Sequence, residues 1–196
     1  MTQTWSHYRY AVVDVEGNGQ QPPDLVELAI VPISEGQIGT AHSWLVKPPR
    51  PITPMAKRFH RINNEDVASA PSAEEAADDI RKELDGAVFV AHNAHVDLGV
   101  LARTLPGFAP AEVVDTLKLA RRLLPGQVSY RLGSLVEAFS LGAGISKALQ
   151  PHRATYDALV CARLLTRLAS PPDRPALTLT ELLGNEGPDD KAEALF

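Results

Sequence analysis

The sequence has a single cysteine, few aromatic residues and no long apolar run. Cys161 alone cannot form an internal disulfide framework and is typical of a reducing compartment, so we expect a cytoplasmic protein. No apolar run approaches the ~18 residues that cross a bilayer. The first seven residues also lack the apolar segment of a signal peptide, and we expect no membrane partner.

An excess of positive charge is missing as well. The chain has 24 acidic and 19 basic residues and a formal net charge of −5, which excludes a bulk electrostatic grip on nucleic acid. The balance reverses between residues 111 and 170, which is typical either of a local face that tracks a nucleic-acid backbone or of solvated helix arginines. The basic residues of this segment are Lys118, Arg121, Arg122, Arg131, Lys147, Arg153, Arg163 and Arg167.

The length of 196 residues and the hydrophobic fraction of 44% are typical of one globular domain. We predict a domain over residues 1–169 and a tail over 170–196 with one short helix. Residues 8–15 are apolar on both faces, which indicates a central buried strand. Strands over 25–33 and 36–46 would complete an antiparallel meander, and 87–91 and 113–114 are short strands. Predicted helices cover 54–59, 64–68, 72–84, 94–105, 116–124, part of 129–139, and 152–169.

Two carboxylates end the central strand. Asp14 and Glu16 are two residues apart, so they point to the same face at about 7 Å from each other. A solvated strand end before a turn would have the same pattern. The pair alone therefore does not indicate a catalytic or metal-binding site, and further acids are needed for that interpretation.

Two more acids lie on apolar helix faces. Asp97 begins the apolar stripe of the helix over 94–105, where the helix dipole alone would also favour an acid. Asp157 falls within the apolar arc of the last long helix, and a buried carboxylate requires a cation or a proton. His152 lies five residues before Asp157, where a capping or surface histidine is the alternative.

Together these residues predict a metal site. Four carboxylates offer hard oxygen ligands, which suit Mg²⁺ or Mn²⁺ and not Zn²⁺. Clustered carboxylates repel one another unless divalent ions neutralise them. Two such ions about 4 Å apart are a known arrangement for phosphodiester displacement.

The order of five motifs resembles the DnaQ-like exonucleases, the DEDDh class of 3′→5′ exonucleases that includes the proofreading subunit of bacterial replicative polymerase. Asp-x-Glu at 14–16, His-Asn-Ala at 92–94 followed by Asp97, and His-x-Ala-x-x-Asp-Ala at 152–158 are similar to its three acidic motifs. A His-x-Ile loop at 60–62 and an Asp-Thr-x-x-Leu-Ala-Arg segment at 115–121 lie between them. The similarity covers residues 8–169, and the four residues between His152 and Asp157 fit the histidine subclass.

The resemblance implies an RNase H-like α/β fold, with a mixed sheet made of the meander and two short parallel strands and with helices on both faces. It implies a metal-dependent 3′→5′ exonuclease that releases nucleoside 5′-monophosphates from single-stranded ends, with DNA as the first expectation. Asp14, Glu16, Asp97 and Asp157 would hold two Mg²⁺ or Mn²⁺ ions, and His152 would be the general base. The substrate would contact Gly17, Asn18, His60, Asn93 and Val96.

The sequence departs from the family pattern around the substrate. Gly17 and Asn18 stand where the family has threonines, Val96 replaces a phenylalanine, and Arg61 replaces a glycine where it could add a phosphate contact. Two alternatives stay open: an RNA-trimming exoribonuclease, and a non-catalytic module that binds nucleic acid or a polymerase. The C-terminal segment 193–196 is loosely similar to a peptide that binds a sliding clamp, and a tail without a partner is the alternative.

Overall fold

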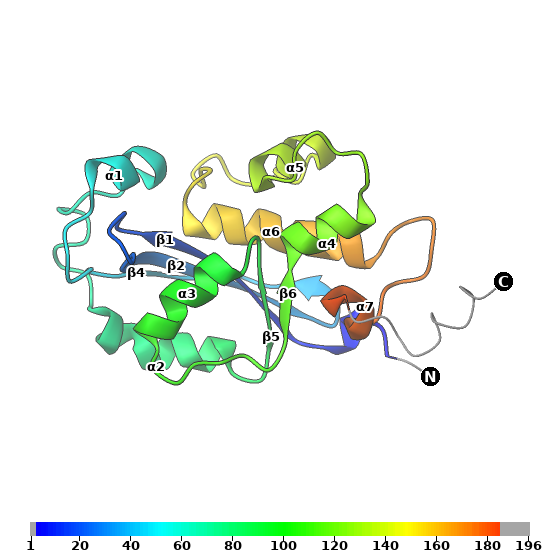
Figure 1. The fold of residues 1–196 in the computed structure, drawn as a ribbon, viewed down its shortest axis with the longest axis horizontal. Coiled ribbons are helices and arrows are strands. Elements are labelled where there is room, and N and C mark those ends of the chain that lie inside the picture. The colour runs from blue at the N-terminus through cyan, green and yellow to red at the C-terminus, as the bar shows by residue number, and fades with distance from the viewer. Residues whose placement is uncertain (1–2, 185–196) are drawn as a thin grey trace.

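The computed structural model describes residues 3–184. Within this range, six strands form one mixed sheet in the order β3-β2-β1-β5-β6, with β4 paired beside β3 on β2 (Figure 1). The strands are β1 (Tyr10–Gly17), β2 (Leu25–Ser34), β3 (Gln37–Ile38), β4 (His42–Leu45), β5 (Val88–Ala91) and β6 (Val113–Asp115). β1 pairs antiparallel with β2 and parallel with β5, and β5 pairs parallel with β6. The predicted mixed sheet is confirmed.

The third strand of the meander differs from the prediction, because residues 36–46 form two short strands. β3 pairs with β2 through Ile33 and Ile38, whereas β4 pairs in a register shifted by one residue. Pro32 lies between the two pairings and has no N–H to give to the ladder. Its carbonyl oxygen instead accepts the N–H of Gly39 at 2.8 Å. The break therefore follows from a proline inside β2.

Seven α-helices surround the sheet in the described range. They are α1 (Pro54–His60), α2 (Ala73–Leu84), α3 (His95–Thr104), α4 (Thr116–Leu123), α5 (Leu132–Phe139), α6 (Ala154–Ala169) and α7 (Leu179–Leu183), and a 3₁₀ turn η1 covers Trp5–His7. A capping box between Ser72 and Glu75 begins α2. The predicted helix over 64–68 is wrong, because these residues form turns. The side chain of Asn63 accepts the N–H groups of Glu65 and Asp66 there, which favours a turn over a helix.

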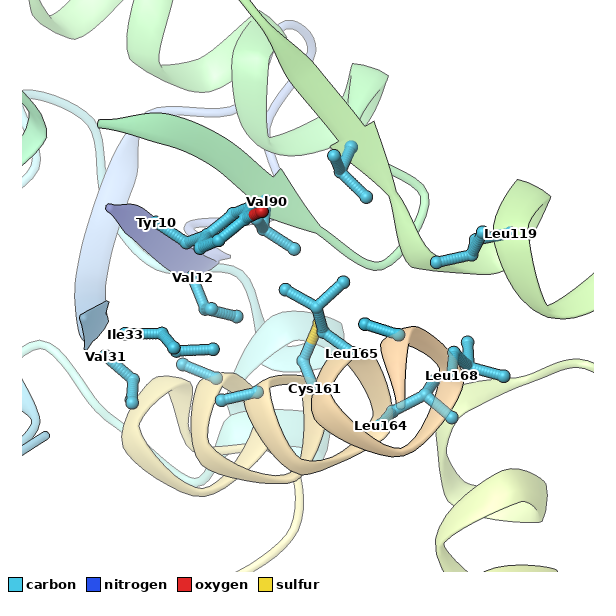
Figure 2. Close-up of a cluster of buried hydrophobic side chains, with 14 of the residues drawn as sticks. Tyr10, Val12, Val31, Ile33, Val90, Leu119, Cys161, Leu164, Leu165 and Leu168 are labelled. Carbon is cyan, nitrogen blue, oxygen red and sulfur yellow. The ribbon is translucent and has the colours of Figure 1, made fainter. Parts of the chain in front are cut away.

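The central strand β1 is buried on both faces, as its composition predicts. Tyr10 and Val12 belong to the core under α6, whereas Ala11 and Val13 pack with α2 and α3 on the opposite face. Figure 2 shows the first of these cores, in which Val12 and Tyr10 face side chains of α6 that include Cys161. Asp14 and Glu16 continue this alternation. They consequently leave the sheet on the α6 side.

The segment after α6 packs on the same molecule. Leu177 and Leu182 are buried in the core of α6, and the indole N–H of Trp5 donates to Ser170 Oγ at 2.8 Å. α7 contacts β6, the edge strand of the sheet. The division at residue 169 stays a prediction, and segment 193–196 lies outside the described residues. Among the described helices, none has the length and apolar character to cross a membrane.

Candidate active site

Three predicted acids meet at the end of β1. Asp14 and Glu16 come from β1 and Asp157 from the first turn of α6, and one carboxylate oxygen from each lies within 4.8 Å of the others. They meet because α6 crosses β1 and β2 with its N-terminal end at the carboxyl end of β1 (Figure 1). Residues 143 positions apart in the chain thus form one cluster. Its members offer only oxygen ligands.

Burial and repulsion by neighbouring carboxylates raise the pKa values of these acids. Burial is the largest cause for each of them. The pKa of Glu16 rises to about 8 with a further contribution from Asp157, and the pKa of Asp157 rises to about 6. The pKa of Asp14 is raised well above its usual range, with Asp97 and Asp157 adding to the effect of burial. The cluster therefore resists full ionisation unless positive charge enters it.

The fourth predicted acid, Asp97, borders the cluster without belonging to the triad. Its side chain is 6% exposed, and its Oδ1 accepts the N–H of Val15 at 3.2 Å. Burial raises its pKa to about 7. Asp97 is thus fixed to the end of β1 from α3, on the side opposite α6. Its negative charge adds to the raised pKa of Asp14.

The residues present fit a divalent cation. Asp14 Oδ2 is buried and has no hydrogen-bond partner among the described residues. An orphaned carboxylate oxygen is costly in a protein interior, and a cation would satisfy it. The oxygen donor set suits a hard cation, without distinguishing Mg²⁺ from Mn²⁺.

His152 lies at the rim of the cluster. Its backbone adopts a left-handed conformation, with φ of 62°, and its N–H donates to Asp157 Oδ2 at 3.1 Å. The helix that we expect from residue 152 begins at Ala154 for this reason. The imidazole is exposed and meets the Phe59 ring edge-on, with the ring centroids 6.3 Å apart. A solvent-facing imidazole therefore stands next to the carboxylates.

Phe59 is a neighbour of His152 that the sequence analysis did not select. It lies on α1 with 58% of its surface exposed, which is unusual for a large aromatic side chain. Val96 on α3 is 48% exposed. In the sequence Phe59 stands between Arg58 and His60, a pattern that does not show whether its ring is buried. Both side chains are available for stacking or packing against a nucleotide.

Two of the predicted substrate-binding residues, Gly17 and Asn18, are required by the structure of the turn after β1. A Cβ atom at Gly17 would lie 3.0 Å from Pro23 Cβ, so even a small side chain would crowd the turn. Asn18 is fully buried, and its Nδ2 donates to Asp24 Oδ2 at 2.7 Å while its Oδ1 accepts the N–H of Asp24 at 2.9 Å. Arg50 completes this group through a bidentate pair with Asp24. The side chain of Asn18 holds the turn and is not free to contact substrate.

His60 and Asn93 also have structural partners. His60 is 2% exposed, its Nδ1 accepts the N–H of Ile62 at 3.0 Å, and burial lowers its pKa. Asn93 has φ of 73°, a conformation that asparagine tolerates well, and its N–H donates to Asp115 Oδ1 at 3.1 Å. Asn93 is half-buried at the junction of β5 and α3. A role for either residue toward a substrate stays a prediction.

Several basic side chains of segment 111–170 make contacts within the protein. Arg163 donates to the carbonyl oxygens of Leu141 and Ala143, and Arg167 lies 4.6 Å above the ring of Phe139. Arg61 outside this segment bonds to Gln150. These contacts support the interpretation of structural arginines for part of the segment. Lys118, Arg121 and Arg131 are exposed.

Comparisons with known proteins agree with this geometry. Residues 11–165 match the RNase T family model, which is described as "Exonuclease". The chain belongs to this exonuclease family. The resemblance to DnaQ-like exonucleases is thereby confirmed, and with it the prediction of a nuclease.

Individual members of the exonuclease family are similar over most of the chain. Exodeoxyribonuclease 10 of Escherichia coli strain K12 is 36% identical over 88% of this chain and 74% of that protein. The 3′-5′ exonuclease DinG of Bacillus subtilis is 35% identical over 84% of this chain, which spans only 18% of DinG. A structure of Exonuclease X in complex with 5′ overhanging duplex DNA has a TM-score of 0.73 at 35% identity and covers 89% of this chain and 99% of that one.

Proposed function

We propose that this protein is a 3′→5′ exonuclease that removes nucleoside 5′-monophosphates from single-stranded DNA ends. The observation that carries the proposal is the carboxylate triad within 4.8 Å beside an exposed histidine, in a chain of the exonuclease family. The names of similar proteins, an exodeoxyribonuclease and a DNA-bound exonuclease, favour DNA over RNA.

Asp14, Glu16, Asp97 and Asp157 would hold the divalent cations. When bound, Mg²⁺ or Mn²⁺ would supply the positive charge that a phosphodiester displacement needs. The His152 imidazole would accept the proton of the attacking water, because it is exposed and its backbone is tied to Asp157. Phe59 would stack on a base at the 3′ end, and Val96 would pack against the same nucleotide. Asn93 and the backbone of Gly17 would line the remaining side of this pocket.

The proposal is tested with paired 5′-labelled DNA and RNA oligonucleotides in Mn²⁺, Mg²⁺ or EDTA. We expect a ladder that shortens from the 3′ end in either metal, no products in EDTA, and faster loss of DNA. A 3′-phosphate should block the reaction, and Asp14→Asn should abolish it in the same preparation.

Three results would decide between this function and its alternatives. Faster loss of the RNA strand would favour the exoribonuclease. Efficient cutting of circular single-stranded DNA would refute an exonuclease. Binding of the oligonucleotide without hydrolysis in any metal would favour a non-catalytic module.

A further inference from the structure

A fifth carboxylate lies beside the triad without belonging to it. Glu27 is on β2, directly opposite Glu16 in the antiparallel ladder, and is only 5% exposed. Like charges at directly opposed positions of a sheet destabilise it. A buried glutamate at this position therefore requires a compensating partner, and the sequence pattern of an apolar strand gives no reason for it.

Arg153 and the start of α6 supply that compensation. Arg153 Nη2 donates to Glu27 Oε1 at 2.5 Å, and Arg153 Nε lies 3.0 Å from Oε2. The N–H of Ala154, the first residue of α6, also donates to Oε2 at 2.9 Å. Both oxygens of Glu27 thus accept N–H groups. This carboxylate is not available as a cation ligand.

Three consecutive residues are consequently fixed at the start of α6. The N–H of His152 is held by Asp157, the guanidinium of Arg153 by Glu27, and the N–H of Ala154 by Glu27. Glu27 is held inside the sheet, because it pairs with Glu16 of β1 on one side and with Leu45 of β4 on the other. The hydrogen bonds of Arg153 and Ala154 therefore fix this turn relative to β2, and with it the neighbouring residues His152 and Asp157.

We propose that Glu27 and Arg153 are positioning residues of the exonuclease reaction. They fix the first turn of α6 to β2 and so hold His152 in its left-handed conformation and Asp157 toward Asp14 and Glu16. This inference rests on the proposed function, since it assigns the pair to the same site. Neither residue needs to touch the reacting atoms for this role.

The test is a double-mutant cycle between Glu27 and His152, measured as kcat and KM on a 5′-labelled DNA oligonucleotide with Mn²⁺. We expect Glu27→Ala to lower kcat about 10²-fold, the cost of a misplacement of roughly 1 Å, with KM nearly unchanged. Because Glu27 would act in part through His152, the loss caused by Glu27→Ala should be smaller in a His152→Ala background than in the wild type. Full additivity of the two losses would overturn the proposal.

Two further variants separate positioning from stability. Leu168→Ala removes a buried side chain from the far end of α6, so it should lower the melting temperature but leave kcat near the wild-type value. The double variant Glu27→Met/Arg153→Met replaces both charges by apolar groups, which often preserves folding, and should still have a low kcat. It also supplies the test if Glu27→Ala does not fold. A wild-type kcat in this double variant, or a loss in Leu168→Ala equal to that of Glu27→Ala, would refute positioning.

Failure of this inference differs from failure of the proposed function. If the wild-type protein does not degrade the oligonucleotide in any metal, the proposed function is wrong. If the wild type is active and Glu27→Ala is equally active, only the positioning role is wrong.

Discussion

The N–H of His152 donates to the Asp157 carboxylate, yet the roles proposed for the two residues predict different effects of Mn²⁺ on the melting temperatures of their variants. Asp157→Asn removes one negative charge at nearly constant volume from a cluster whose members repel one another. At pH 8 we expect it to raise the melting temperature of the metal-free protein and to weaken the stabilisation by Mn²⁺. Activity should fall by several orders of magnitude. Thermal unfolding in EDTA and over a Mn²⁺ titration measures the first two effects.

His152→Ala is the matched variant for that experiment. It removes no proposed ligand, so the increase in melting temperature with Mn²⁺ should persist. The rate should fall about 10²–10⁴-fold, which is the usual contribution of a general base. Loss of the Mn²⁺ effect in this variant would mean that His152 is a ligand or a structural residue, and that the proposed base is wrong.

Phe59 permits a prediction about substrate binding. Its ring is largely exposed, so Phe59→Ala should change the melting temperature little. It should raise KM for DNA oligonucleotides by about 5–150-fold, since stacking of a base contributes roughly 1–3 kcal/mol. Phe59→Trp should retain most of the affinity. Steady-state kinetics on one oligonucleotide measures all three proteins, and an unchanged KM in Phe59→Ala would place the terminal base elsewhere.

The predicted site residues differ in how well the neighbouring sequence indicates whether a side chain is buried and what it contacts. Asp14 and Asp157 are recognisable because a charge interrupts an apolar strand or an apolar helix face. Asn18 is not, because asparagine is common in exposed turns and nothing nearby in the sequence shows that its side chain is buried against Asp24 and the carbonyl oxygen of Arg50. Phe59 was missed for the converse reason. Hydrophobic residues are expected inside, and only the structure places this ring at the surface.

At the scale of elements, local signals give the type of each helix or strand better than its limits. The Ser72–Glu75 capping box fixes the start of α2 within its own turn. The start of α6 instead depends on Glu27, which lies 127 residues before Ala154 and is invisible to helical periodicity. The split between β3 and β4 likewise arises from Pro32 on the neighbouring strand.

α7 is an element whose contribution can be measured separately. Leu182 is 3% exposed in the core, and α7 contacts the edge strand β6. Leu182→Ala should lower the free energy of unfolding by about 2–5 kcal/mol, as large-to-small core substitutions do. The increase in melting temperature with Mn²⁺ should be unaffected. Urea unfolding of both proteins measures the difference, and a loss below about 0.5 kcal/mol would show that α7 contributes little to the fold.

At the scale of the whole molecule, the raised pKa values couple stability to pH. Glu16 titrates at about 8 in the folded protein and near 4.5 as its ordinary value, and Asp157 at about 6 against 3.8. The folded state therefore binds more protons than the unfolded chain between these values. The metal-free protein should lose stability as the pH rises from about 5 to 8.

Thermal unfolding in EDTA at pH 5.5 and pH 8 tests this coupling. We expect the lower melting temperature at pH 8 and a larger stabilisation by Mn²⁺ there, because protons no longer compete for the carboxylates. Glu16→Gln should flatten the dependence on pH. A metal-free melting temperature that rises steadily over this interval would contradict the repulsive cluster.

The bonds at residues 152–154 have a consequence for the lengths of loops that this fold can accept. Each of these residues is paired separately, so inserting or deleting one residue there would move every later partner out of register. The preceding stretch is less constrained at Ser146, Lys147 and Ala148, which are all exposed. Extra residues should therefore be tolerated there. A designer could graft a longer nucleic-acid-binding loop at this point without rebuilding the start of α6, where the proposed site lies.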